Sequence, residues 1–256
     1  MIKGSPVGNV YRLLLKAFGP QGWWPVTPRG AASPVYKPRS YGRRSAPEMA
    51  EICAGAILTQ NTAWTNVEKA LAGLRGAGLL PGNGNNISVC PLPRLERLIK
   101  PSGYYRQKAR RLKNFFARAG GEHPEGLERW FLSSPADTLR TELLSYKGVG
   151  PETADSMVLY AAGLPSFVID AYTRRIGSRL GLGRGGDYGR WKRIFENGLP
   201  RRTEIYNEYH ALLVRLGKDF CRKSAPLCGG CPLRKECTYA GRRKAHGKDR
   251  SSARQR

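Results

Sequence analysis

The 256-residue sequence has few acidic residues, few cysteines and no long apolar run. Asp and Glu number 19 against 44 Lys and Arg, which gives a formal net charge of +25. This excess goes far beyond what solubility requires and indicates a polyanionic partner. No apolar run approaches the length of a membrane span, and residues 1–8 offer no signal-peptide core. We therefore expect a cytoplasmic protein with no membrane partner.

Cysteine is scarce but clustered. Six cysteines are too few for a disulfide scaffold in a chain of this length, and four of them lie between Cys221 and Cys237. In a reducing compartment such a cluster indicates a metal site. The hydrophobic content of 40% is enough to build a core, so the composition argues against disorder.

The positive charge is spread along the chain. Residues 238–256 form a basic tail of net charge +6, and the rest of the chain still carries +19. A highly charged solvated surface usually has nearly balanced signs, so this imbalance favours nucleic-acid binding that weakens as salt is raised.

Apolar periodicity interrupted by Gly and Pro predicts an all-α protein of two helical lobes, with almost no strand signal. Residues 22–44 lack periodicity and predict a long loop. The expected helices are Val7–Phe18, Ala46–Leu58, Trp64–Ala77, Leu92–Ile99, Tyr105–Arg118, Ala136–Ser145, Pro151–Ala162, Ala171–Leu180, Tyr188–Asn197 and Glu204–Gly217.

The run from Leu143 to Ala154 has the layout of two helices joined by a tight turn. Gly148 and Gly150 permit backbone conformations that side chains forbid, and Pro151 suits the first position of the next helix. Backbone amides that point outward from such a turn bind a phosphate oxygen without any side-chain charge. An ordinary helical corner is the alternative, and the net charge of +25 favours phosphate binding.

Asp170 stands at the predicted start of a helix, twenty residues beyond Gly150. Most aspartates in this position are simple N-caps. Here one amphipathic helix separates Asp170 from the hairpin, which would bring the carboxylate back toward it.

The run from Leu143 to Arg179, together with the four clustered cysteines, resembles the helix-hairpin-helix DNA glycosylase superfamily, in particular its endonuclease III-like members. The resemblance covers most of the chain, from about Ala46 to Cys237. It implies that Lys147, Gly148, Val149 and Gly150 grip the DNA backbone beside a flipped-out nucleotide. It also implies that Asp170 assists cleavage of the N-glycosidic bond, by stabilising an oxocarbenium ion and orienting water.

One position departs from the family pattern. Members that also nick the strand carry a Lys two residues after the last Gly of the hairpin, where it forms a Schiff base with the sugar. This chain has Glu152 there, and Lys147 lies on the other side of the turn. The resemblance therefore implies a monofunctional enzyme that uses water and has no efficient lyase step.

The cysteines Cys221, Cys228, Cys231 and Cys237 follow the spacing Cys-x6-Cys-x2-Cys-x5-Cys. A zinc ribbon normally has two closely spaced pairs, and this array has one. The spacing is similar to the C-terminal loop of endonuclease III-like proteins, which implies a 4Fe-4S cluster; zinc is the alternative. Four basic residues lie between or beside the ligands and would face DNA: Arg222, Lys223, Arg234 and Lys235.

Two aromatic segments, Trp23-Trp24-Pro25 and Gln60-Asn61-Thr62-Ala63-Trp64, look like the 3-methyladenine DNA glycosylase branch. In that branch, aromatic side chains from these segments sandwich an alkylated purine, a cationic base that attracts π faces and leaves without a general acid. Core packing is the alternative for Trp23 and Trp24. We expect Gln60 and Asn61 to fill the hole left in the duplex.

These features predict a DNA N-glycosylase that acts as a monomer on double-stranded DNA containing a damaged base, associated with the nucleoid. We expect residues 1–45 and 136–237 to form a discontinuous lobe and residues 46–135 a central helical lobe. The alternatives are a glycosylase of the same fold for oxidised or deaminated bases, and a non-catalytic DNA-binding protein. The second is disfavoured because an acid near DNA phosphates is costly without a catalytic use.

Overall fold

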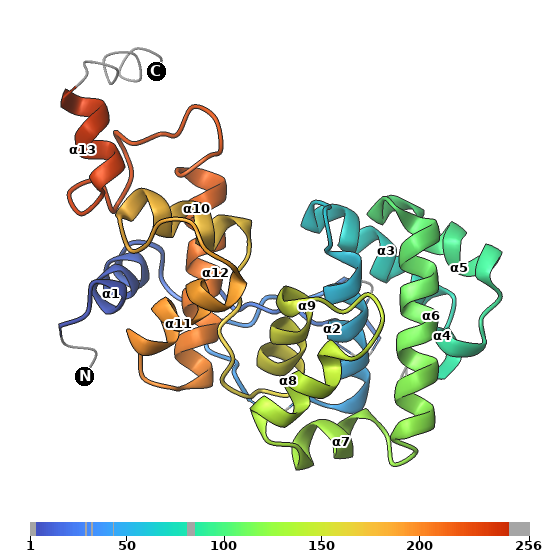
Figure 1. Ribbon diagram of the computed structural model, residues 1–256. Helices are drawn as coiled ribbons and strands as arrows, with labels where there is room; N and C mark the ends of the chain where they lie inside the picture. The colour runs from blue at the N-terminus through green and yellow to red at the C-terminus, as the bar shows by residue number, and fades with distance from the viewer. Residues whose placement is uncertain (1–3, 29, 32, 43, 81–84, 246–256) are drawn as a thin grey trace. The chain divides into compact units, whose positions relative to one another are not determined.

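The computed structural model describes residues 4–28, 30–31, 33–42, 44–80 and 85–245. Thirteen α-helices lie within these ranges, with one isolated β-bridge between Val26 and Val35 and no strand (Figure 1). The predicted all-α class is confirmed. None of the described helices has the length and apolar character needed to cross a bilayer.

The chain divides into two compact units, and each contains helices that the sequence predicts. The first unit joins Met1–Trp23 to Phe167–Arg256. Its helices are α1 (Pro6–Phe18), α10 (Ala171–Leu180), α11 (Tyr188–Asn197), α12 (Thr203–Asp219) and α13 (Thr238–Ala245). Helix α12 is the centre of this unit and packs on both α1 and α10.

Aromatic side chains fill the core of the first unit. Phe167 stacks on Phe195 with ring centroids 4.7 Å apart, and Tyr209 of α12 meets both rings edge-on. The Tyr209 hydroxyl donates to the carbonyl of Val7, which ties α12 to α1. Helix α10 also packs on α12, so Asp170, at the start of α10, lies next to α12.

The second unit spans Trp24–Ser166. Its elements are α2 (Ala46–Leu58), α3 (Trp64–Gly76), α4 (Asn85–Val89), α5 (Leu92–Leu98), the 3-10 turn η1 (Lys100–Ser102), α6 (Tyr105–Glu122), α7 (Leu127–Ser133), α8 (Ala136–Leu144), α9 (Pro151–Ser156) and the π-helical turn η2 (Met157–Ala161).

Helix α2 is the central element of the second unit. Ser45 and Glu48 form a capping box at its start, and every residue from Met49 to Leu58 is buried. A helix that is apolar all round must be covered on all sides, and α2 contacts α3, α6, α7, α9 and η2 (Figure 1).

The boundaries of the two units differ from those that we predicted. The second unit begins at Trp24 and ends at Ser166, whereas the sequence placed the central lobe at residues 46–135. The reason is that α8, α9 and η2 belong to the packing around α2. Ion pairing supports this assignment, because buried Asp155 joins Arg140 of α8 at 2.8 Å and accepts from Ser166.

Most predicted helices are present with ends shifted by a few residues. The predicted helix Pro151–Ala162 is divided into α9 and the π turn, and α4, α7 and α13 have no counterpart among the predicted helices. The predicted tail begins with the helix α13, and its residues 246–256 lie outside the described ranges.

Candidate DNA-binding and catalytic site

The predicted helix-hairpin-helix is formed by α8, a short turn and α9. The turn is closed by the Val149 N–H, which donates to the Tyr146 carbonyl at 3.0 Å. Gly148 has φ +92°, a conformation that favours glycine. Gly150 does not need this freedom, contrary to our expectation, because it has φ −91° as the N-cap of α9.

The outer side of this turn is suited to an anion. Gly150 and Lys147 are exposed. Among the described residues, neither the Gly148 nor the Gly150 N–H has an acceptor in the protein. Unpaired amides beside a cation and a helix start form a site for a phosphate oxygen. Glu152 is exposed on the first turn of α9.

Gln60 lies against the hairpin. Its Nε2 donates to the Gly148 carbonyl at 3.1 Å and to Thr153 Oγ1 at 3.0 Å, and its Oε1 accepts from the Arg111 guanidinium. Asn61 is exposed, with φ +53°. Of the two residues expected to enter DNA, the structure therefore gives Gln60 partners within the protein and leaves the Asn61 side chain facing solvent.

Helix α6 also holds the first helix of the hairpin. Arg118 donates to the Ser145 carbonyl at 2.8 Å and lies 4.1 Å from the centre of the Tyr146 ring. Glu122 pairs with Arg118 at 2.8 Å and accepts from the Tyr146 hydroxyl at 3.0 Å. The end of α8 is therefore fixed two to three residues before Gly148.

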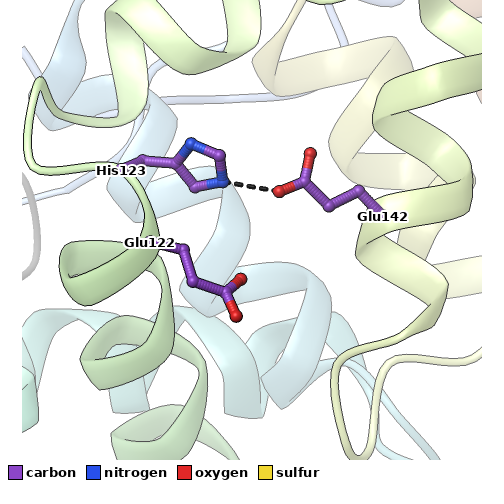
Figure 2. A group of neighbouring side chains, drawn as sticks. All are labelled: Glu122, His123 and Glu142. Carbon is purple, nitrogen blue, oxygen red and sulfur yellow. Dashed lines mark hydrogen bonds and ion pairs between the residues drawn. The ribbon is translucent and has the colours of Figure 1, made fainter.

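A histidine next to this network joins the end of α6 to α8. His123 Nε2 pairs with Glu142 Oε1 (Figure 2), with 2.6 Å between the two atoms. The Trp130 indole donates to Glu142 Oε2 at 2.9 Å. Ligand atoms of Glu122, His123 and Glu142 lie within 4.8 Å of one another, close enough for a small cation. Protein groups already pair with each of these carboxylates, so we interpret the cluster as an anchor for the hairpin.

Asp170 is the N-cap of α10. Its Oδ1 accepts from the Thr173 N–H at 2.7 Å, and its Oδ2 lies 3.7 Å from His210 Nε2 on α12. The two side chains are 12% and 8% exposed. Burial alone would raise the pKa of Asp170, but His210 and the N–H of Thr173 outweigh it and hold that pKa below 3.8. Asp170 is therefore a largely buried carboxylate that stays ionised.

His210 was missed by the sequence analysis, which gave it no role. It lies forty residues beyond Asp170 and in a different helix, and its spacing from other residues does not match a metal-ligand pattern. Only the packing of α10 on α12 brings the two side chains together. The signal available in the sequence was a histidine directly before the apolar run Ala-Leu-Leu-Val.

The predicted pocket aromatics form a closed cluster in the second unit. Trp24 is 4% exposed and packs against Gly55, where a Cβ atom would lie 2.9 Å from its ring. Trp24 contacts the Tyr160 ring at 5.3 Å and the Trp64 ring at 5.1 Å, the latter at 88°. Two rings that touch edge to face leave no gap for a base between them, so the predicted sandwich is not formed in this conformation.

The flanking residues of these segments are less enclosed. Trp64 is half-buried, and its indole N–H donates to Glu68 Oε1 at 2.9 Å. Pro25 is buried beside Trp24, and Trp23 is half-buried in the first unit. Trp23 and Trp64 are therefore more accessible than Trp24 and Pro25.

The four clustered cysteines form no disulfide, and Cys231 lies close enough to the other three to feel their charges. Burial, together with the charges of the other three thiols, raises the pKa of Cys231 to about 11. Within the described residues, no three cysteine sulfurs lie within 4.8 Å of one another. Four sulfurs around one zinc ion would be about 3.8 Å apart, so this loop is wider than a zinc site.

A cation lies against this loop. Arg179 Nη1 is 3.2 Å from the Sγ of Cys221, and the Arg179 carbonyl lies 3.4 Å from the Sγ of Cys237. The four predicted DNA-facing cations of the loop are exposed: Arg222, Lys223, Arg234 and Lys235. Cys53 is fully buried in α2, as expected for a core residue, and burial raises its pKa.

A hairpin with open amides is one feature of the helix-hairpin-helix class of DNA-repair proteins, and a largely buried, ionised aspartate at a helix start is another. The family model described as HhH-GPD superfamily base excision DNA repair protein matches residues 54–201. This range includes the hairpin and Asp170. The chain belongs to the HhH-GPD superfamily, and it is a DNA glycosylase of base excision repair.

Curated relatives support the assignment. The candidate DNA repair glycosylase MJ1434 of Methanocaldococcus jannaschii is 42% identical over 243 residues, which cover 92% of this chain and 97% of that protein. Endonuclease III of Bacillus subtilis is 31% identical over 166 residues, which cover 61% of this chain and 67% of that protein.

Solved structures share the fold. A non-covalent endonuclease III–DNA complex has a TM-score of 0.70 at 22% identity and covers 93% of this chain and 96% of that chain. The Helicobacter pylori 3-methyladenine DNA glycosylase MagIII, bound to 1,N6-ethenoadenine, has a TM-score of 0.60 at 27% identity and covers 68% of this chain and 89% of that chain.

Proposed function

We propose that this glycosylase is monofunctional and hydrolyses the N-glycosidic bond of a flipped-out alkylated purine in double-stranded DNA, with Asp170 as its catalytic carboxylate. The observation that carries the proposal is the environment of Asp170, which keeps a buried side chain ionised between His210 and the start of α10. A fixed negative charge in a site of low dielectric stabilises a developing cation strongly.

The reaction needs two contributions from this chain. The hairpin amides at Gly148 and Gly150 bind a phosphate and hold the strand beside the extruded nucleotide. As the bond between base and sugar breaks, its electron pair leaves with the base, and Asp170 stabilises the oxocarbenium ion. Because an alkylated purine is cationic, it leaves as a neutral base when it takes this electron pair. Water then bonds to the sugar C1′ and gives a proton to Asp170.

Asp170→Asn is the test, and the chain provides a matched control. Asp187 is also an N-cap, with Oδ1 accepting from the Arg190 N–H at 2.7 Å. Asparagine caps helices well, so both variants should fold. We expect Asp170→Asn to keep DNA affinity and lose at least about a hundredfold in single-turnover base release, and Asp187→Asn to retain activity. Equal activity of the two variants would remove Asp170 from catalysis.

The choice of alkylated purines rests on the aromatic cluster and on the likeness to MagIII. A cationic purine gains a cation-π contribution from aromatic faces and needs no general acid. The second candidate is an endonuclease III-like glycosylase for oxidised or deaminated bases, and the relatives named endonuclease III support it. The closed contact between Trp24 and Trp64 does not distinguish the two candidates, because a base of either class would have to separate the two rings to enter between them.

A panel of duplexes, each with one damaged base, separates these candidates. Release of 3-methyladenine supports the alkylpurine assignment, and release of thymine glycol alone supports the second. Failure to release any base while DNA binding is retained would favour a non-catalytic DNA-binding role.

Glu152 carries the proposal that the enzyme is monofunctional. Its carboxylate is exposed at the start of α9, where lyase-active relatives have an amine. Borohydride should therefore fail to trap the protein on DNA, because no imine forms. Efficient trapping would instead point to Lys147 on the other side of the turn.

The four C-terminal cysteines fit a 4Fe-4S cluster, which Cys221, Cys228, Cys231 and Cys237 would hold. Their sulfurs are spaced more widely than one zinc ion requires, and Arg179 offsets the charge of a thiolate ligand. Such a cluster would supply the cross-link that orders the loop. Purified protein should be brown and hold about four irons per chain. Colourless protein with stoichiometric zinc would refute this assignment.

A further inference from the structure

One face of α6 makes a series of contacts with the hairpin and with the end of α2. We propose that Gln60 and Arg111 form a brace that sets the hairpin turn in its phosphate-binding conformation before DNA arrives. The brace therefore makes Gln60 a positioning residue. This inference rests on the proposed role of the hairpin in gripping DNA.

Gln60 makes the central contact of the brace. Its amide donates to the carbonyl of Gly148 and to the hydroxyl of Thr153, so one group spans the turn and the first turn of α9. Thr153 is buried, and Gln60 is half-buried. A planar amide that joins two points of the turn restricts the backbone whose N–H groups face outward.

Arg111 holds Gln60 from the other side. Its guanidinium donates to Gln60 Oε1, which leaves Gln60 Nε2 to point at the hairpin. The Arg111 side chain also lies directly under the turn, because a Cβ atom on Gly148 would be 2.7 Å from its Cγ and 2.8 Å from its Cδ. The Arg111 side chain can therefore occupy this position only because residue 148 has no Cβ atom.

Lys108 completes the face, one turn before Arg111. Its ammonium donates to the Leu58 carbonyl at 2.8 Å and to the Ser102 carbonyl at 2.6 Å, and the residue is 1% exposed. Leu58 is the last residue of α2, two positions before Gln60. Lys108 therefore fixes the segment that presents Gln60, while Arg111 fixes its side chain.

The brace predicts a particular pattern of binding defects. Preset amides bind phosphate without an ordering cost, and phosphate contacts carry no base information. Loss of the brace should therefore weaken binding to intact and damaged duplexes by the same factor. A Gln60 side chain that filled the hole at the lesion would affect damaged duplexes alone.

The test measures amide hydrogen exchange at Val149 and Gly150 in the DNA-free protein, together with affinity for both duplexes. Gln60→Ala and Thr153→Val each remove part of the brace, and Arg111→Met removes the guanidinium but keeps the stem. Arg110→Met, at an exposed neighbour, is the control for loss of one positive charge.

We expect faster exchange at Val149 and about tenfold weaker binding to both duplexes in the brace variants. The effects of Gln60→Ala and Arg111→Met should be less than additive, because both act through one contact. Arg110→Met should lower the salt dependence of binding and leave exchange unchanged.

Unchanged exchange at Val149 in Gln60→Ala, or a defect confined to damaged DNA, would overturn the brace. The exchange measurement needs neither DNA nor activity, so it tests the brace even if no base is released. Faster exchange with unchanged affinity for both duplexes would mean instead that the hairpin does not grip DNA.

Discussion

The two glycines of the hairpin should respond differently to alanine, although both face the same turn. Gly148 has φ +92°, and an added Cβ would lie 2.7 to 2.9 Å from three atoms of Arg111. The backbone conformation alone costs about 1–2 kcal/mol for a residue with a side chain. Moving Arg111 away from Gln60 adds about 1–2 kcal/mol, since the lost hydrogen bond has a charged donor.

Gly148→Ala should therefore lower the free energy of unfolding by about 2–4 kcal/mol, or the midpoint of thermal unfolding by about 5–15 °C for a chain of this size. Gly150 has φ −91°, and nothing lies within 4 Å of its added Cβ. Alanine there is a poorer N-cap but reduces the entropy of the unfolded chain, so stability should change by less than about 0.5 kcal/mol.

Both variants should bind DNA more weakly, because each methyl group lies on the amide-bearing turn. Calorimetry gives the stability, and fluorescence anisotropy with intact and damaged duplexes gives the affinity. Neither variant should change the ranking of damaged bases. Equal stability of the two variants would refute the conformational argument, and a changed base preference would refute the phosphate assignment.

Three further predictions concern single side chains. The lowered pKa of Asp170 should stabilise the fold above pH 3.8, so the stability difference between the wild-type protein and Asp170→Asn should shrink as the pH falls below 3.8. Burial and the charge of Arg111 lower the pKa of Lys108 from 10.5 to about 8, so the unfolded chain binds more protons between those values. Stability should therefore rise with pH from about 8 to 10 relative to Lys108→Met, in urea unfolding, and a parallel dependence in both proteins would contradict the assignment. Trp64→Ala should reduce single-turnover release of an alkylated purine by about tenfold to a hundredfold, with Trp64→Phe largely retaining it, and full activity of the alanine variant would exclude stacking.

The hairpin, the N-cap and the cysteine array were predictable because each is a local pattern. Gly148, Pro151 and Asp170 act on backbone within a few residues, so their structural positions follow from the sequence. The role of Asp170 beyond a cap came from the family resemblance, since an N-cap alone does not distinguish a catalytic aspartate from Asp187.

The partners of these residues were not predictable. Gln60 reaches Thr153 across 93 positions, and His210 reaches Asp170 across forty. Such pairs depend on which faces of two helices meet, and helical periodicity identifies a buried face without naming its neighbour. For the same reason the sequence predicted aromatic residues near a pocket but not the contact that closes Trp24 against Trp64.

The chain order of the first unit has a consequence for folding during synthesis. Residues 24–166 form a contiguous unit, whereas α1 packs on α12 about two hundred positions later, as in the bond from Tyr209 to Val7. Chains emerge from the ribosome N-terminus first, so a contact between distant segments forms only after the later segment has been synthesised. The helix at residues 6–18 must therefore remain without its partner while the whole second unit is made, and during that time its apolar face is open to aggregation or to a chaperone.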